Sequence, residues 1–205
     1  MQLTKNDKII ISQVLRQGFY FALIILFIFA IHFIAYKVHG KTFAEHGIIE
    51  NIQLGILFAA TFSFFLQAKY NAEYRIVLLL LASASMMACF RELDKFFDAI
   101  LPIVSWRIGL LLPFFTVGLA LKNLKKVKKS LKRFLVTPAF NMMFCAMIII
   151  VPVAQCIGHG PFVRNVLEIQ DISAIKELFE EASEALGYML IFLASLECIW
   201  SMPKK

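Results

Sequence analysis

The sequence predicts an all-α membrane protein: a compact bundle of six transmembrane helices with short loops and both termini in the cytoplasm. Of the 205 residues, 60% are hydrophobic and only 17% are charged, whereas a soluble domain is usually about 45–50% apolar. The excess falls in blocks of roughly 15–25 residues, the length that crosses about 30 Å of hydrocarbon. Phe is abundant, with 21 residues, while Gly and Pro are few, which favours helices over a β-barrel. A disordered chain, a disulfide scaffold and an ordinary soluble enzyme are excluded.

Six apolar blocks mark the expected spans, and they cover residues 17–36, 48–68, 76–97, 103–121, 134–156 and 173–200. The first block is too long for a signal-peptide core and no small-residue cleavage pattern follows it, so we expect a retained span. Neither a repeat nor a linker divides the chain, and residues 1–205 are expected to form a single integral-membrane domain. The cysteines lie in or beside apolar blocks without CxxC spacing, which favours small buried hydrophobes; they are Cys89, Cys145, Cys156 and Cys198.

The basic residues predict the orientation. With the N-terminus inside, fourteen of the 21 Lys and Arg residues fall on the cytoplasmic face, while eleven of the 14 acidic residues fall on the outer face. This positive-inside distribution accounts for the net charge of +7. It does not point to nucleic acid, because no globular domain remains to form a basic groove. In a bacterium the protein is expected in the plasma (inner) membrane.

One connection between spans has a pattern of its own. Residues 121–135 carry leucines at helical spacing with lysines elsewhere, which predicts an amphipathic helix lying on the inner leaflet. Its simplest role is an orientation signal joining two spans. Recognition of anionic lipid or of a partner is the alternative.

Five of the six spans place a polar side chain at one level. Counting about 1.5 Å per residue from the inner end of each span, this level lies about 22–24 Å up, roughly 6 Å below the outer surface. The fifth span offers only apolar residues there and is expected to face lipid. An arginine at this depth could also snorkel outward and a histidine could simply be packed, but the shared level favours a common site. The five residues are His32, Gln53, Arg91, Arg107 and Glu184.

Helical spacing enlarges this expected site. Glu181, Glu184 and Tyr188 share one helical face, as do Glu50 and Gln53. A buried guanidinium needs a carboxylate partner, so Arg91 or Arg107 is expected to pair with Glu184 and Glu181. The inner halves of the spans are almost purely apolar, which predicts a pocket open to the outside rather than a pore. The mouth is expected to be lined by Glu50, Asn51, Glu92 and Asp94.

The leading functional hypothesis is an outward-facing intramembrane site that binds, and as a hydrolase or transferase could alter, an anionic lipid or a lipid-linked substrate. Glu184 would be the general base and His32 a second acid–base group. No hydrolase motif such as GxSxG or HExxH occurs in the sequence. The substrate-binding residues would be Arg91, Arg107, Gln53, Glu181 and Glu50.

Two other functions stay open. A non-enzymatic structural or accessory subunit would use its buried charges to hold the helices in register or to dock a membrane-protein partner or a second copy. A small transporter would need polar groups in the inner halves. A divalent metal is a weaker hypothesis, because carboxylates near helix ends usually face water; its ligands would come from His46, Glu50, Glu181 and Glu184, joined by His32 or His159.

Overall fold

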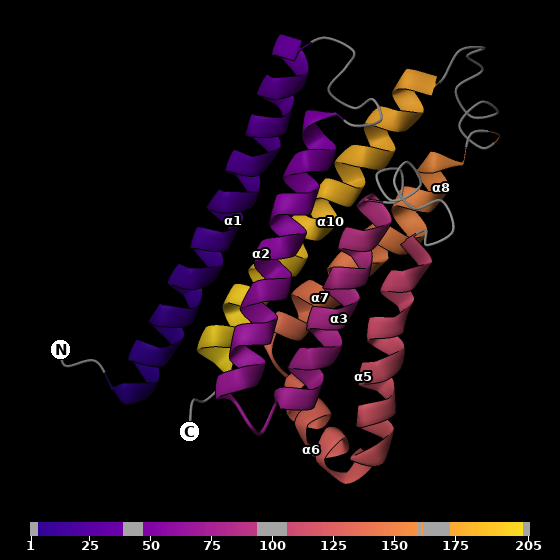
Figure 1. Cartoon of the computed structure of the whole chain (residues 1–205). Coiled ribbons are helices and arrows are strands. Elements are labelled where there is room, and N and C mark those ends of the chain that lie inside the picture. Colours follow the sequence, from indigo (N-terminus) through magenta and orange to yellow (C-terminus); the bar gives the residue numbers. More distant parts are fainter. Residues whose placement is uncertain (1–3, 39–46, 94–105, 160, 162–172, 203–205) are drawn as a thin grey trace. The chain divides into compact units, whose positions relative to one another are not determined.

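The computed structural model describes residues 4–38, 47–93, 106–159, 161 and 173–202, and these residues are helical apart from short turns (Figure 1). The expected all-α class is therefore confirmed. The chain divides into two compact units, Met1–Thr42 and Phe43–Lys205.

The N-terminal unit contains one long helix, α1 (Lys5–Val38). Its start is stabilised by a reciprocal cap: the backbone N–H of Thr4 donates to Oδ2 of Asp7 at 2.9 Å, and the backbone N–H of Asp7 donates to Oγ1 of Thr4 at 3.2 Å. Residues Asp7–Ile34 are long and apolar enough to cross a membrane. The helix begins well before residue 17 because the polar lead continues it.

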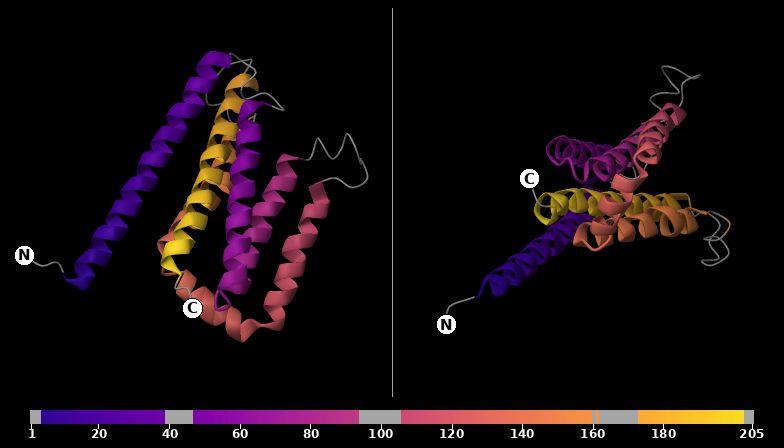
Figure 2. Two further views of the ribbon diagram at one scale, coloured as in Figure 1. Left: turned by 60° about the vertical axis from the view of Figure 1, so that its left-hand side comes forward. Right: turned by 90° about the horizontal axis from the view of Figure 1, so that it is seen from below.

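In the C-terminal unit, α10 is the central helix (Figure 2). It packs against α2 on one side and against α7, η2 and α8 on the other, while α3 lies beside α2 and α5 beside α3. The elements are α2 (Ile48–Tyr70), α3 (Arg75–Glu92), η1 (Trp106–Leu110), α5 (Leu111–Lys122), α6 (Leu124–Phe134), α7 (Pro138–Ile148), η2 (Ile149–Val153), α8 (Ala154–Gly158) and α10 (Ser173–Ser201).

Residue size determines which helix faces meet. Small side chains on α10 allow close approach of neighbouring backbones, the usual basis of helix association in a membrane; the buried ones include Ala185, Gly187, Ala194 and Ser195. The facing stripe of α2 repeats at helical spacing and is buried; it consists of Ile49, Gln53, Leu57, Ala60, Phe64 and Ala68.

Two glutamines of α2 fix its register against α10. Nε2 of Gln53 donates to the backbone oxygen of Glu181 at 3.0 Å, and Nε2 of Gln67 donates to the backbone oxygen of Ser195 at 2.9 Å. Both pairs are 128 residues apart in the chain, so α2 and α10 run parallel and advance together over about four turns.

The span that contains α7, η2 and α8 is widened at its middle. Pro152 has no N–H to donate, and the helix forms the π-turn η2 around it. Gly187 of α10 lies so close to this turn that a β-carbon would overlap the side chain of Ile150. The opposite side of the span exposes an apolar face, and its contact with lipid stays a prediction; the face includes Phe144, Met147, Ile148, Val151 and Val153.

The expectation of buried cysteines is only half right. Cys89 and Cys198 are buried, whereas Cys145 and Cys156 are exposed on α7 and α8. An apolar sequence context does not separate the two cases, because lipid and protein interior are equally apolar environments.

The basic connection forms α6, which bends away from the η1–α5 helix by 107° at Asn123. The expected amphipathic helix is present, and the face that packs against the protein is a different one from the leucine stripe that was expected on the membrane. Ser130 and Phe134 are buried, while Leu124 and Leu131 are exposed. This face docks on the turn between α2 and α3.

Two contacts attach α6 to that turn. Oγ of Ser130 donates to the backbone oxygen of Glu73, and the guanidinium of Arg133 pairs with the Glu73 carboxylate. The α6 helix is thereby held at the end of the bundle opposite to the start of α10 (Figure 1).

Within the described ranges, four helices are long and apolar enough to span a membrane, and the bent pair Arg107–Lys122 and Leu124–Phe134 would be a fifth. The other four candidates are Asp7–Ile34, Ile48–Tyr70, Pro138–Ile157 and Lys176–Ser201. Helix α3 is not among them, because its 18 residues include Arg75, Arg91 and Glu92. The structure thus supports an integral membrane protein of four to five candidate spans.

Candidate functional site

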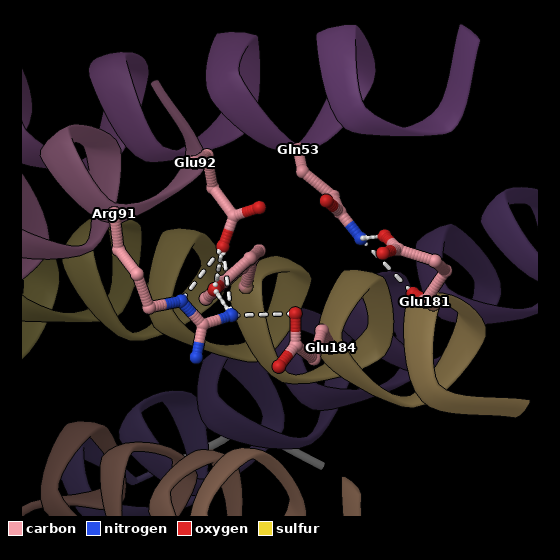
Figure 3. A network of polar contacts seen from close by, with 6 residues as sticks. Gln53, Arg91, Glu92, Glu181 and Glu184 are labelled. Carbon is pink, nitrogen blue, oxygen red and sulfur yellow. Dashed lines mark hydrogen bonds and ion pairs between the residues drawn. The ribbon is translucent and has the colours of Figure 1, made fainter. Parts of the chain in front are cut away.

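Polar side chains from α2, α3 and α10 gather at one end of the C-terminal unit (Figure 3). Here α2 and α10 begin and α3 ends. On α10 the polar residues repeat at helical spacing and so share one face, and on α3 Arg91 lies in the last turn, where the helix dipole favours a cation. We refer to these six residues as the polar cluster: Gln53, Arg91, Glu92, Glu181, Glu184 and Tyr188.

The guanidinium of Arg91 is the centre of the polar cluster. Its Nη2 lies 2.5 Å from Oε2 of Glu184 and donates to the hydroxyl oxygen of Tyr188 at 2.8 Å. Oε1 of Glu92 accepts from Nε of Arg91 at 3.1 Å, from Nη2 at 2.8 Å and from the hydroxyl of Tyr188 at 2.6 Å. Charge-assisted contacts of this kind are the strongest hydrogen bonds in proteins. They join the end of α3 to α10.

Gln53 forms the second part of the polar cluster. Its Nε2 donates at 3.0 Å both to the backbone oxygen of Glu181 and to Oε2 of the same residue. Gln53 is fully buried. The amide therefore ties α2 to α10 one turn before the contact that Arg91 makes.

Burial differs sharply within the ion-pair network. The side chains of Glu92 and Glu184 are 7% and 5% exposed, whereas that of Arg91 is 36% exposed. Tyr188 is buried as well. The carboxylates and the phenol thus hold the arginine from within the bundle and leave part of its guanidinium accessible.

The predicted pairing of Arg91 with Glu184 is present, but the predicted pairing of an arginine with Glu181 is not. Glu181 bonds to Gln53 instead of an arginine. Arg107 is exposed on η1, and none of the described carboxylates pairs with it. The structure does not bring Arg107 into the polar cluster.

Glu50 is half-buried one turn before Gln53 on the same face of α2, and it is close enough to interact electrostatically with Glu181. Asn51 is exposed and bonds through its Nδ2 to the backbone oxygen of Gly47 at 3.1 Å. His32 belongs to α1 in the N-terminal unit, and its part in the site stays a prediction. His46 and Asp94 lie outside the described residues.

Sequence reasoning gave two members of the polar cluster no binding or catalytic role. Tyr188 shares a helical face with Glu181 and Glu184, so spacing pointed to it. Glu92 was expected at the mouth, yet it is buried and accepts three hydrogen bonds. Adjacent residues of a helix diverge, and no sequence signal indicates that Arg91 folds back onto its neighbour at the helix end.

The other end of the bundle is more polar than expected. Glu197 of α10 is 1% exposed, and Nε2 of Gln67 bonds to Oγ of Ser63 at 3.0 Å in addition to the backbone of α10. The inner half of α10 therefore contains one buried carboxyl group near its end, although residues 189–193 are purely apolar as expected. Between the two ends, the buried residues remain largely apolar, with Leu57, Phe64, Leu78 and Leu193 fully buried.

Among the described residues, no group of three or more His, Cys, Asp or Glu side chains is arranged to hold a metal ion. His159 is exposed at the end of α8. Glu50, Glu181 and Glu184 come from two helices, but they do not form a ligand set.

No protein-family model matches the chain, and neither curated proteins nor solved structures give a match.

Proposed function

We propose that the protein spans the membrane six times with both termini in the cytoplasm, and that the polar cluster is an outward-facing site for a lipid or lipid-linked substrate bound through its anionic phosphate. The distribution of Lys and Arg supports this orientation. It places basic α6 on the cytoplasmic side and the polar cluster near the outer leaflet. A phosphate-bearing lipid headgroup is the ligand most available at that depth.

The partial exposure of Arg91 is the observation that carries the proposal. Two buried carboxylates and a phenol fix the side chain of Arg91, yet 36% of it is accessible. Its Nη1 takes no part in the described hydrogen bonds. A guanidinium that is held in place from behind presents a preformed donor to phosphate, at little cost in side-chain ordering.

Binding is better supported than catalysis. Glu184 would be the general base in a hydrolysis or transfer reaction, with His32 as the second acid–base group, but Glu184 is committed to Arg91. Incubation of the purified protein with phospholipid, followed by mass spectrometry of the products, tests for turnover. Unchanged lipid would assign the site to binding alone.

The experiment compares variants of Arg91 by native mass spectrometry of the purified protein in a mixture of phosphatidylglycerol and phosphatidylethanolamine. Arg91→Lys keeps the charge and loses the planar fork, so bound phospholipid should fall roughly tenfold. Arg75→Gln is the matched control, because Arg75 lies on the same helix at its other end and donates to the backbone oxygen of Ala68. Arg107→Gln tests whether the second predicted arginine contributes. Equal phospholipid retention by wild type, Arg91→Lys and Arg91→Gln would overturn the proposal.

A structural or accessory subunit is the second candidate function. The specific observation in its favour is that the polar cluster ties three helices together, with Gln53 joining α2 to α10 and Arg91 joining α3 to α10. Lipid binding by the folded fraction of Glu184→Ala separates the two. Lost lipid binding in that fraction would favour the site, and full lipid binding in it would favour the structural role. A transporter has less support, because no charged side chain lies on α2, α3 or α10 between the two ends in the described ranges.

A further inference from the structure

The polar cluster contains more hydrogen-bond acceptors than donors. Among its described residues, one guanidinium faces the carboxylates of Glu92, Glu181 and Glu184. Glu92 and Glu184 each use a single oxygen in their contacts with Arg91 and Tyr188, which leaves Oε2 of Glu92 and Oε1 of Glu184 outside the described hydrogen bonds. The excess of negative charge opposes a ligand that is purely anionic.

Gln53 adds an independent observation. The residue is fully buried, and its Oε1 has no hydrogen-bond partner among the residues that the structure describes. The orientation of the amide is determined, because the other atom meets two acceptors of Glu181 and must therefore be the N–H donor. Figure 3 shows the carbonyl turned away from Glu181, to the side on which Glu92 and Arg91 lie. Unpaired buried acceptors are rare in proteins, and none of the described residues donates to this one.

Resting on the proposed function, we propose that the donor to this oxygen is the primary ammonium of a zwitterionic phospholipid headgroup of the ethanolamine type. A primary ammonium offers three N–H donors and no acceptor, which matches two sites that only accept and that are turned toward each other in Figure 3: Oε1 of Gln53 and the oxygen of Glu92 that lies outside the described hydrogen bonds. Its positive charge compensates the excess of carboxylate. The short link to the phosphate leaves that anion beside Arg91, whose side chain is 36% exposed and whose Nη1 lies outside the described hydrogen bonds.

The test uses a headgroup series in which only the N–H donors change. The full chain is reconstituted in phosphatidylcholine nanodiscs, and the competing lipid is phosphatidylethanolamine or its mono- and dimethylated forms. All carry a phosphate and a positive nitrogen, but each methyl group removes one donor. Bound lipid is measured by native mass spectrometry, and we expect phosphatidylethanolamine to be preferred over phosphatidylcholine roughly tenfold or more.

Variants of the polar cluster test whether its acceptor oxygens cause the preference for phosphatidylethanolamine. Gln53→Leu removes the unpaired carbonyl oxygen and should abolish the preference for phosphatidylethanolamine over phosphatidylcholine. Glu92→Gln, which keeps the shape of the side chain, should weaken the preference without loss of the fold. Gln67→Leu is the matched control, because Gln67 makes the same contact to the α10 backbone at the other end of α2 and should keep the full preference.

The failures of the two proposals are distinguishable. Phospholipid binding that depends on Arg91 but shows no preference along the methylation series would overturn the ammonium site and leave the proposed function standing. The absence of any Arg91-dependent phospholipid binding would overturn both. Free ethanolamine is added as a separate arm, and thermal stabilisation by it that lipid does not exceed would overturn the lipid as the source of the ammonium.

Discussion

Replacing Glu184 by glutamine should destabilise the protein, and the contact between Glu184 and Arg91 gives the expected loss of stability. The substitution keeps the shape of the side chain and removes the charge that faces Nη2 of Arg91 at 2.5 Å. A charge-assisted hydrogen bond contributes about 1.5–3 kcal/mol. The loss should stay below the roughly 3–5 kcal/mol of a buried charge left alone, because Glu92 still pairs with Arg91. For a chain of this length, the melting temperature should fall by about 3–12 °C.

The assay heats the detergent-solubilised protein and measures the monodisperse fraction by size-exclusion chromatography. Glu177→Gln is the control, since Glu177 lies two turns earlier on the same face of α10 but is exposed. It should melt like the wild type. If Glu184→Gln also melts within about 1 °C of the wild type, the ion pair contributes nothing measurable to stability and the account of the polar cluster given above is refuted.

Three further predictions concern packing and orientation. Gly187→Ala should lower stability by about 1–3 kcal/mol in the same assay, because the new β-carbon overlaps η2. Gly118→Ala is the control and should not lower stability, because its β-carbon meets nothing within 4 Å. Equal melting temperatures of the two variants would contradict the close packing of Gly187. Thr116→Val removes the 2.8 Å hydrogen bond between α5 and α3 and should cost only about 0.6 kcal/mol, so a larger loss would show that packing is affected too. In a background without native cysteines, Lys129→Cys should react with a membrane-impermeant maleimide only in inverted vesicles and Glu177→Cys only in right-side-out vesicles; the reverse pattern would invert the orientation.

The helical class and most spans were predictable because the length of an apolar block is a direct physical requirement of the bilayer. The faces of those helices were not. On α6 the leucines mark a stripe, yet Ser130 and Phe134 are the residues that pack inward. Likewise, Cys145 and Cys156 are exposed in apolar surroundings. Hydropathy distinguishes side chains that face water from side chains in apolar surroundings. It does not distinguish side chains that face lipid from side chains in the protein interior.

The candidate site was predictable where helical periodicity acts within one element. The shared face of Glu181, Glu184 and Tyr188 follows from their spacing, and so does the need of Glu184 for a cationic partner. The choice between Arg91 and Arg107 depends on which helix packs beside α10, and this is a tertiary property. The depth counted along each span could not distinguish the two arginines, because this depth is about the same for both.

The two glutamine contacts between α2 and α10 require the same number of residues between them in both helices. One residue inserted into α2 between Gln53 and Gln67 would rotate the later part of the helix by about 100° and advance it by about 1.5 Å. Gln67 would then turn away from the carbonyl of Ser195 that it now contacts. Insertions or deletions should therefore be tolerated only when both helices gain or lose the same number of whole turns. The length of the bundle along the helix axes can change only in such steps.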